Sequence, residues 1–126
     1  MHIQTPLARA KGLGSAKTGL HHWWVQRLTA IALIPLVVWF VVIVLQAAQA
    51  EQGMLEILAS PVQTGALLLF IVIGLYHGCL GMQVVIEDYV HCGCAKLTLL
   101  IITYFISVIS GLAAALAVLY AHFGGV

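Results

Sequence analysis

The sequence predicts an all-α integral membrane protein with three transmembrane helices and a cytoplasmic N-terminus. Of its 126 residues, 63% are hydrophobic and only 7% are charged, and the mean hydropathy is +1.10. A soluble domain carries far more charge than this. The apolar residues are also gathered in three long blocks, each close to the roughly 20 residues that cross a bilayer core. We therefore expect residues 1–126 to form a single membrane domain.

The N-terminal part of the chain is expected to lead from the cytoplasm into the first span. Residues 1–20 are polar and rich in glycine, which predicts a cytoplasmic arm. The pair Trp23-Trp24 lies beside Arg27 at the start of the first apolar block, a combination typical of an interfacial anchor. The first span is predicted at 24–48. Pro35 lies inside it and removes a backbone donor, so a kink is expected there.

Two further spans follow, at 64–87 and at 96–122. An acidic, glycine- and proline-containing loop precedes the second span, and a short polar turn joins the second to the third. In the third span, Ser107, Gly111 and Ala115 recur every four residues. Small residues at this spacing let membrane helices pack closely, so we predict a close-packing face there.

The positions of the basic residues predict the orientation. With three spans, all five Lys and Arg fall on one side of the membrane: Arg9, Lys11, Lys17, Arg27 and Lys96. The positive-inside rule assigns that side to the cytoplasm and places the C-terminus outside. We expect the bacterial inner membrane as the location. The basic residues form no dense cluster, so we expect no nucleic-acid partner.

His77 is the residue of the second span that points most directly to chemistry. Ionisable groups at this depth in a bilayer are costly and usually functional. A neutral imidazole is a good iron ligand, and haem is a common reason for a histidine inside a helix bundle. We predict that His77 is an axial ligand of haem iron. The alternative is a buried histidine that only hydrogen-bonds to a neighbouring helix.

Other histidines of the chain cannot complete such a site from within the membrane. His21, His22 and His91 are expected at the cytoplasmic rim, and His122 near the opposite rim. A haem held by two histidines would therefore need its second ligand from another polypeptide.

Asp88 and Tyr89 end the same stripe of the second span. Gly81, Val84 and Asp88 follow His77 at helical spacing, so the four share one face. A phenol can donate a hydrogen bond to a quinone carbonyl, and a nearby carboxylate can orient the phenol and relay protons. These residues predict a quinone site. The alternative is a plain helix end with an interfacial tyrosine.

Two other groups were weighed for a role. Arg27 is expected to anchor the topology, and it also lies at the depth where haem propionates would emerge, six residues after His21. Guanidinium suits bidentate pairing with carboxylates. The stretch His91-Cys92-Gly93-Cys94 resembles a zinc site only weakly, because it has one short C-x-C and no second pair.

Two motifs give the chain a family resemblance. The first is Gly14-Ser-Ala-Lys-Thr-Gly-Leu-His-His-Trp-Trp-Val-Gln-Arg-Leu-Thr-Ala30, with small residues, an aromatic pair and then Q-R-x-T-A. The second is His77-x-x-x-Gly81-x-x-Val84-x-x-x-Asp88-Tyr89. Together with the three spans, they resemble the hydrophobic membrane anchor subunit, the D-type chain, of succinate dehydrogenase (respiratory complex II).

This resemblance implies a set of cofactors and partners. The haem would be a haem b shared with a cytochrome b-type membrane subunit, with His77 as this chain's ligand. Arg27, supported by His21, would face the haem propionates, and the resemblance gives His22 no role. Tyr89, held by Asp88, would hydrogen-bond ubiquinone near an iron–sulfur subunit, and a flavoprotein subunit would complete the complex. The chain alone would have no activity.

Two rival functions stay open on the sequence. A fumarate reductase anchor would share the chemistry in the reverse direction. A small transporter or channel subunit would do no redox work, but the three spans carry no intramembrane carboxylate to couple a substrate to protons.

Overall fold

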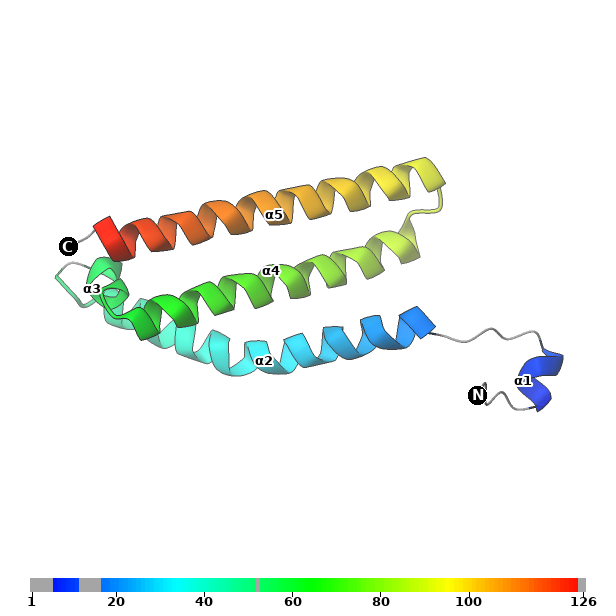
Figure 1. Cartoon of the computed structure of the whole chain (residues 1–126), viewed down its shortest axis with the longest axis horizontal. Helices are drawn as coiled ribbons and strands as arrows, with labels where there is room; N and C mark the ends of the chain where they lie inside the picture. Colours follow the sequence, from blue (N-terminus) through cyan, green and yellow to red (C-terminus); the bar gives the residue numbers. More distant parts are fainter. Residues whose placement is uncertain (1–5, 12–16, 52, 125–126) are drawn as a thin grey trace.

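The computed structural model describes residues 6–11, 17–51 and 53–124, and all regular structure in them is helical. The helices are α1 (Pro6–Ala10), α2 (Lys17–Ala47), α3 (Met54–Leu58), α4 (Pro61–Tyr89) and α5 (Gly93–Gly124) (Figure 1). Three of them, α2, α4 and α5, are long and apolar enough to cross a membrane. The predicted all-α fold with three membrane helices is confirmed.

The three long helices extend past the predicted spans. The helix α2 begins at Lys17 rather than at residue 24, so the last part of the predicted arm is helical. The other two spans, predicted at 64–87 and 96–122, lie inside α4 and α5. Hydropathy detects only the apolar part of a helix, whereas the backbone hydrogen bonds continue into the polar boundary without needing apolar side chains. The second and third predicted spans are therefore shorter than the helices that contain them, whereas α2 ends at Ala47, one residue before the predicted end of the first span.

The helix α4 is the middle element of the bundle. It packs against α2 along one side and against α5 along the other (Figure 1). The start of α2 and the turn at 90–92 lie at one end of the bundle, whereas α3 and the end of α5 lie at the other. Residues on α4 can therefore face either neighbour, and His77 belongs to the side that faces α2.

The end that contains α3 is the packed end of the bundle, and we call it the closed end. The short helix α3 contacts α2, α4 and α5. Leu58, Leu67 and Val118 form a buried cluster there. The rings of Phe40 and Phe70 stack on each other with centroids 4.7 Å apart and pack against this cluster. The sequence prediction of a plain loop at 49–63 missed α3, whose five residues are too few to give a helical period.

Gly53 makes the turn into α3 possible. Its φ of 60° is the only positive φ among the described residues. A side chain at this backbone conformation would be strained, so glycine is the residue that fits.

The opposite end, formed by the start of α2 and the turn at 90–92, is the open end. Polar side chains join α4 to α5 there. Tyr104 donates a hydrogen bond to Gln83 Oε1 (2.9 Å), and Gln83 donates to the Glu87 carboxylate (2.8 Å). Lys96 donates to the Glu87 backbone carbonyl at 3.0 Å. These contacts fix α5 to the end of α4.

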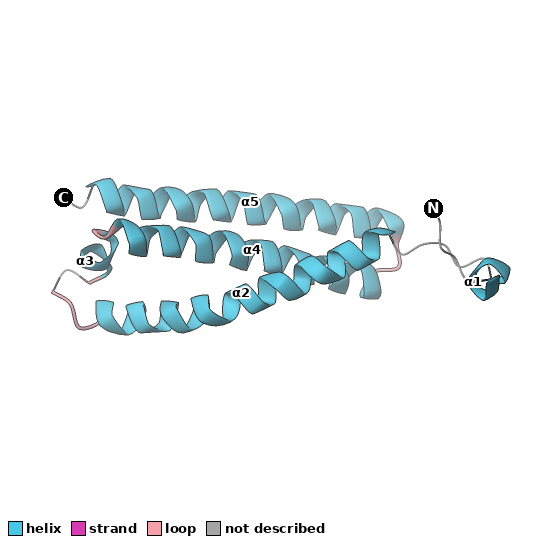
Figure 2. Ribbon diagram, turned by 60° about the horizontal axis from the view of Figure 1, so that its bottom comes forward, coloured by secondary structure: helices cyan, strands magenta, loops and turns pink. Residues whose placement is uncertain are grey.

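Most large apolar side chains of the long helices are exposed. Val38 on α2 and Phe105 on α5 are 61% and 65% exposed, with many similar neighbours. Such surfaces are unfavourable in water and suited to lipid or to another membrane helix. Pro35 lies inside α2, which bends along its length (Figure 2), as expected for a helix that lacks one backbone donor.

Candidate functional site

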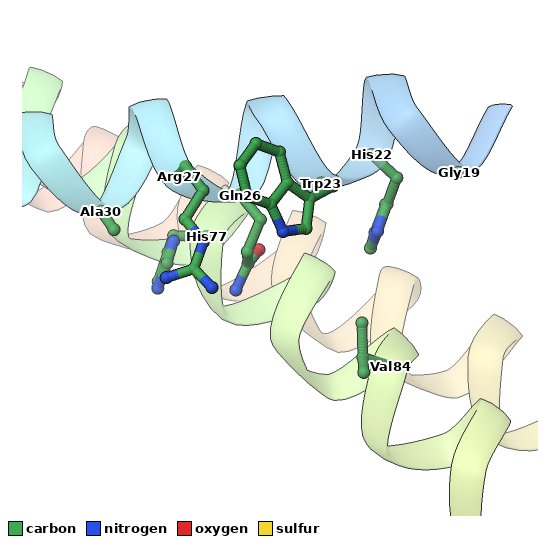
Figure 3. Close-up of a pocket in the computed structure, with 8 residues that line it drawn as sticks. All are labelled: Gly19, His22, Trp23, Gln26, Arg27, Ala30, His77 and Val84. Atoms are coloured by element: carbon green, nitrogen blue, oxygen red, sulfur yellow. The ribbon is translucent and has the colours of Figure 1, made fainter. Parts of the chain in front are cut away.

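A cavity of about 560 Å³ lies between α2 and α4 in the half of the bundle toward the open end (Figure 3). Its walls come from these two helices alone, with lining residues Gly19, His22, Trp23, Gln26, Arg27, Ala30, His77 and Val84. A volume of this size falls in the range of roughly 300–1,000 Å³ that is usual for cofactor and ligand sites. Two helices cannot surround a ligand, and no other element in the described part of the chain lines this cavity.

His77 is held against α2 by one of its two ring nitrogens. Its Nδ1 lies 2.9 Å from Thr29 Oγ1, and both side chains are partly buried. This contact leaves Nε2 as the ring nitrogen available to a ligand in the cavity. The hydrogen bond to a neighbouring helix, which was the alternative for His77, is therefore present. It uses only Nδ1, one of the two ring nitrogens.

Two buried polar atoms at the cavity have no hydrogen-bond partner among the described residues. They are His22 Nε2 and Gln26 Oε1. An unpaired buried polar atom costs about 1–3 kcal/mol. The oxygen and nitrogen of a glutamine amide are assigned from their surroundings, so Gln26 can present either a donor or an acceptor here. A ligand with polar groups would remove the cost of both atoms.

Gly81 lies on α4 opposite Gln26 of α2. A Cβ added there would lie 3.5 Å from Gln26 Nε2, and a longer side chain would extend into the space between α2 and α4. The predicted gap on the His77 face of the helix is therefore present, with His77 and Val84 on either side of it in the cavity wall.

Arg27 supplies the positive charge of the cavity. Its guanidinium carbon lies 5.4 Å from the centre of a Trp23 ring, a cation–π distance. Trp23 in turn meets Trp24 edge to face at 5.1 Å. Arg27 is exposed, so its charge is available both to an anchoring role at the membrane boundary and to a carboxylate in the cavity.

His21 and His22 lie on different sides of α2. His22 and Gln26 are four residues apart and share one face, with Thr29 three residues farther along it. His21 is rotated from this face by about 100°, is exposed, and does not line the cavity. No role was predicted for His22. The helical spacing of His22, Gln26 and Thr29, which places them on one face of α2, was the signal that could have indicated a role at the cavity.

Asp88 and Tyr89 lie apart from the cavity. Both are exposed at the end of α4, and Tyr89 is 78% exposed. Twelve residues separate Tyr89 from His77, or roughly 18 Å along the helix axis. Among the described residues, no hydrogen bond joins the side chains of Asp88 and Tyr89. The chain itself thus presents a free phenol beside a carboxylate, without the walls of a binding site.

The residues present fit a haem that is shared with another chain. In the described part of the chain, no three His, Cys, Asp or Glu side chains come together to hold a metal ion. A haem iron needs only one axial nitrogen from this chain. His77 can provide it, while Arg27, His22 and Gln26 offer groups for polar substituents at the edge of such a ligand.

Comparison with known proteins gives one consistent result. Residues 1–119 match the family described as succinate dehydrogenase/fumarate reductase transmembrane subunit. A succinate dehydrogenase hydrophobic membrane anchor subunit of Rickettsia bellii is 38% identical over 119 residues, which are 94% of this chain and 95% of that protein. The subunit of the same name from Paracoccus denitrificans is 32% identical over 122 residues, 96% and 91% of the two chains. No solved structure matches the chain significantly.

The fold and the matches define a multi-pass membrane subunit, and the chain belongs to the succinate dehydrogenase/fumarate reductase transmembrane subunit family. Within this family, the function supported is that of a membrane anchor subunit of succinate dehydrogenase. The predicted resemblance is thus confirmed. Family membership also gives no support to the alternative function as a transporter or channel subunit.

Proposed function

We propose that this anchor subunit contributes His77 Nε2 as one axial ligand of a haem b, which it shares with a cytochrome b-type membrane subunit. The observation that carries the proposal is the fixed imidazole of His77, with Nδ1 bonded to Thr29 and the ring bordering the 560 Å³ cavity. A partner helix would close the cavity and supply the second imidazole. When bound, the haem would supply a one-electron redox centre inside the membrane.

The polar groups of the cavity support the same proposal. A haem carries two carboxylates at one edge, and a guanidinium pairs well with a carboxylate. Arg27 is the cation at this cavity, and His22 Nε2 and Gln26 are available as further hydrogen-bonding groups. We propose that Arg27 meets the propionates, with His22 and Gln26 beside it. The supporting role predicted for His21 stays a prediction that its exposed position does not favour.

Tyr89 and Asp88 are proposed to form this chain's part of a ubiquinone site. The phenol of Tyr89 would donate a hydrogen bond to a quinone carbonyl, and Asp88 would orient it and exchange protons with the cytoplasm. The exposure of Tyr89 supports this, because the phenol is free to meet a ligand or a partner. The remaining walls would come from the iron–sulfur subunit and the cytochrome b-type subunit.

The proposed orientation brings these parts to one side of the membrane. Lys17 and Arg27 lie in the first half of α2 and Lys96 lies near the start of α5, toward the open end, while α3, which contains Glu56, lies at the closed end. The positive-inside rule then places the open end in the cytoplasm of a bacterium, with the protein in the inner membrane. The iron–sulfur and flavoprotein subunits would dock on this face and deliver electrons from succinate. The chain itself would bind and position the haem and the quinone, and it would perform no reaction alone.

Fumarate reduction is the second candidate, because the family description covers both enzymes. The curated relatives that match are all named for succinate dehydrogenase, which favours succinate oxidation.

The proposal is tested by optical and EPR spectra of the intact native complex. We expect haem b absorption and the ferric signal of iron bound by two imidazoles, in about one haem per complex. A complex with all subunits and no haem absorption would overturn the proposal, and an EPR signal with a single imidazole would overturn the shared-ligand part of it.

A further inference from the structure

Thr29 makes three short contacts, and together they restrict where its proton can be. Its Oγ1 lies 2.8 Å from the Val25 carbonyl oxygen and 3.1 Å from that of Gln26. It also lies 2.9 Å from His77 Nδ1 on the neighbouring helix. The hydroxyl has one proton, whereas two of these three neighbours are carbonyls that can only accept one.

The contacts select one tautomer of His77. If the Thr29 hydroxyl donates to a carbonyl of its own helix, which is the usual bond of a threonine inside a helix, its oxygen is left to accept. His77 Nδ1 must then carry the proton, and Nε2 keeps a free lone pair. In the opposite arrangement Nε2 would carry the proton, and it could not bind iron.

We propose that Thr29 is a positioning residue, which holds His77 as the Nδ1–H tautomer with Nε2 directed into the cavity. This inference rests on the proposed role of His77 as a haem ligand. It assigns to Thr29 the part that a carbonyl or a carboxylate plays behind many metal-bound histidines, where it fixes the ring and raises the basicity of the ligating nitrogen.

The position of Thr29 on α2 explains why one helix can perform two tasks. Thr29 supports the imidazole from the side away from the ligand, while His22 and Gln26, on the same helix face, line the cavity itself. The orientation of the ring and the shape of the cavity are therefore set by the same helix.

The chain offers a matched control for a threonine substitution. Thr103 on α5 donates the same kind of bond, from Oγ1 to the Leu99 carbonyl at 2.8 Å, and bonds no histidine. Thr29→Val and Thr103→Val each remove a hydroxyl and one such helical bond, while only the first removes the acceptor behind His77. A difference between them reports on His77 alone.

The experiment uses the intact complex with Thr29→Ser, Thr29→Cys, Thr29→Val or Thr103→Val, and it measures haem content, ferric EPR and the haem midpoint potential. We expect wild type, Thr29→Ser and Thr103→Val to agree. Thr29→Val should bind haem about 10- to 100-fold more weakly, as for other losses behind a ligating histidine. Its EPR signal should shift, and its potential should rise, because a less basic imidazole stabilises ferric iron less. Cysteine, a weak acceptor, should give an intermediate shift.

Thr29→Val with wild-type affinity, EPR signal and potential would overturn the inference. If the valine variant does not assemble, a cysteine variant identical to wild type overturns it equally. A wild-type complex without haem would instead refute the proposed function, and the two failures are therefore distinguishable.

Discussion

The two halves of the bundle each contain a histidine beside a threonine, yet the surroundings of the two histidines differ. At the closed end, His122 Nδ1 donates to the Leu58 carbonyl at 2.6 Å, and Thr64 donates to the same oxygen at 2.9 Å. The His122 ring also meets Phe123 edge to face at 4.8 Å. In the other half of the bundle, His77 has one bond to Thr29 and borders a cavity.

This difference separates a histidine that joins helices from one that can bind a ligand. His122 ties α5 to the end of α3, where the buried cluster already fills the interior. His77 lies where two helices leave space and where polar atoms lack partners. A hydrogen-bonded histidine is therefore a candidate ligand when its second nitrogen meets empty space.

The largest expected effect comes from exchanging the two histidines for alanine. His77→Ala should abolish the haem b absorption of the assembled complex, because the proposed axial nitrogen is lost. His122→Ala should keep the haem and lower the free energy of unfolding by only about 0.5–1.5 kcal/mol, since one hydrogen bond is lost while Thr64 still donates to the Leu58 carbonyl. The checks are the optical spectrum and a thermal melt. Unchanged haem in His77→Ala would make the two histidines equivalent.

A second contrast uses the two exposed tyrosines at the ends of the bundle. Tyr89→Phe should lower ubiquinone reduction about 100-fold, which is the low end for losing a positioned proton donor. Succinate oxidation with a soluble dye should stay normal. Tyr120, which is 80% exposed on α5, provides the control. If Tyr120→Phe impaired quinone reduction as much as Tyr89→Phe, the quinone site would not belong to the open end.

A smaller effect is expected from two glutamines, Gln26 at the cavity and Gln63 at the start of α4. Gln63 accepts a hydrogen bond from Trp39 Nε1 at 2.9 Å, whereas Gln26 Oε1 has no partner among the described residues. Gln26→Leu should weaken haem binding about tenfold, equal to about 1.4 kcal/mol, if its amide bonds the ligand. Gln63→Leu should only destabilise the complex, by about 1–3 kcal/mol. Both are measured by haem titration and thermal melts. If the Gln26→Leu complex were more stable and retained its haem, the side-chain amide of Gln26 would not bond a ligand.

The smallest effect concerns packing on the α5 side of α4. A Cβ at Gly111 would lie 3.0 Å from Leu75 Cδ1, whereas a Cβ at Gly65 would meet nothing within 4 Å. Alanine in a helix gains up to about 1 kcal/mol over glycine. Gly65→Ala should keep this gain, while Gly111→Ala should lose it to a displaced Leu75. We expect thermal unfolding to separate the variants by about 1 kcal/mol. Equal stabilisation would show that α4 and α5 are loosely packed.

Much of the membrane fold could be predicted because its signals are local. The apolar blocks indicated three spans, and the small residues around Gly111 indicated a close-packing face on α5, which is the face that meets Leu75 of α4. His77 was identifiable as a candidate because an imidazole is conspicuous in an apolar span, and Arg27 because it is a lone cation at the boundary. All of these depend on residue type and on neighbours a few positions away.

The pairing of residues on different helices could not be predicted in the same way. The contact between Thr29 and His77 depends on how α2 and α4 slide and rotate against each other, and helical periodicity within one span does not contain that register. The choice between His21 and His22 depends on the same rotation. The roles of Asp88 and Tyr89 stay predictions, because the surfaces that would enclose them lie outside this chain.

The unpaired atoms of the open end also bear on how much of this chain a cell can tolerate. A surplus copy that stays alone in the bilayer holds His22 Nε2 and Gln26 Oε1 without partners among its own described residues, and each unpaired buried polar atom costs about 1–3 kcal/mol. Such a copy is less stable than one enclosed by another membrane chain. We expect single copies to be the ones most readily unfolded and removed, so that the lifetime of the protein would depend on how much of its membrane partner is made.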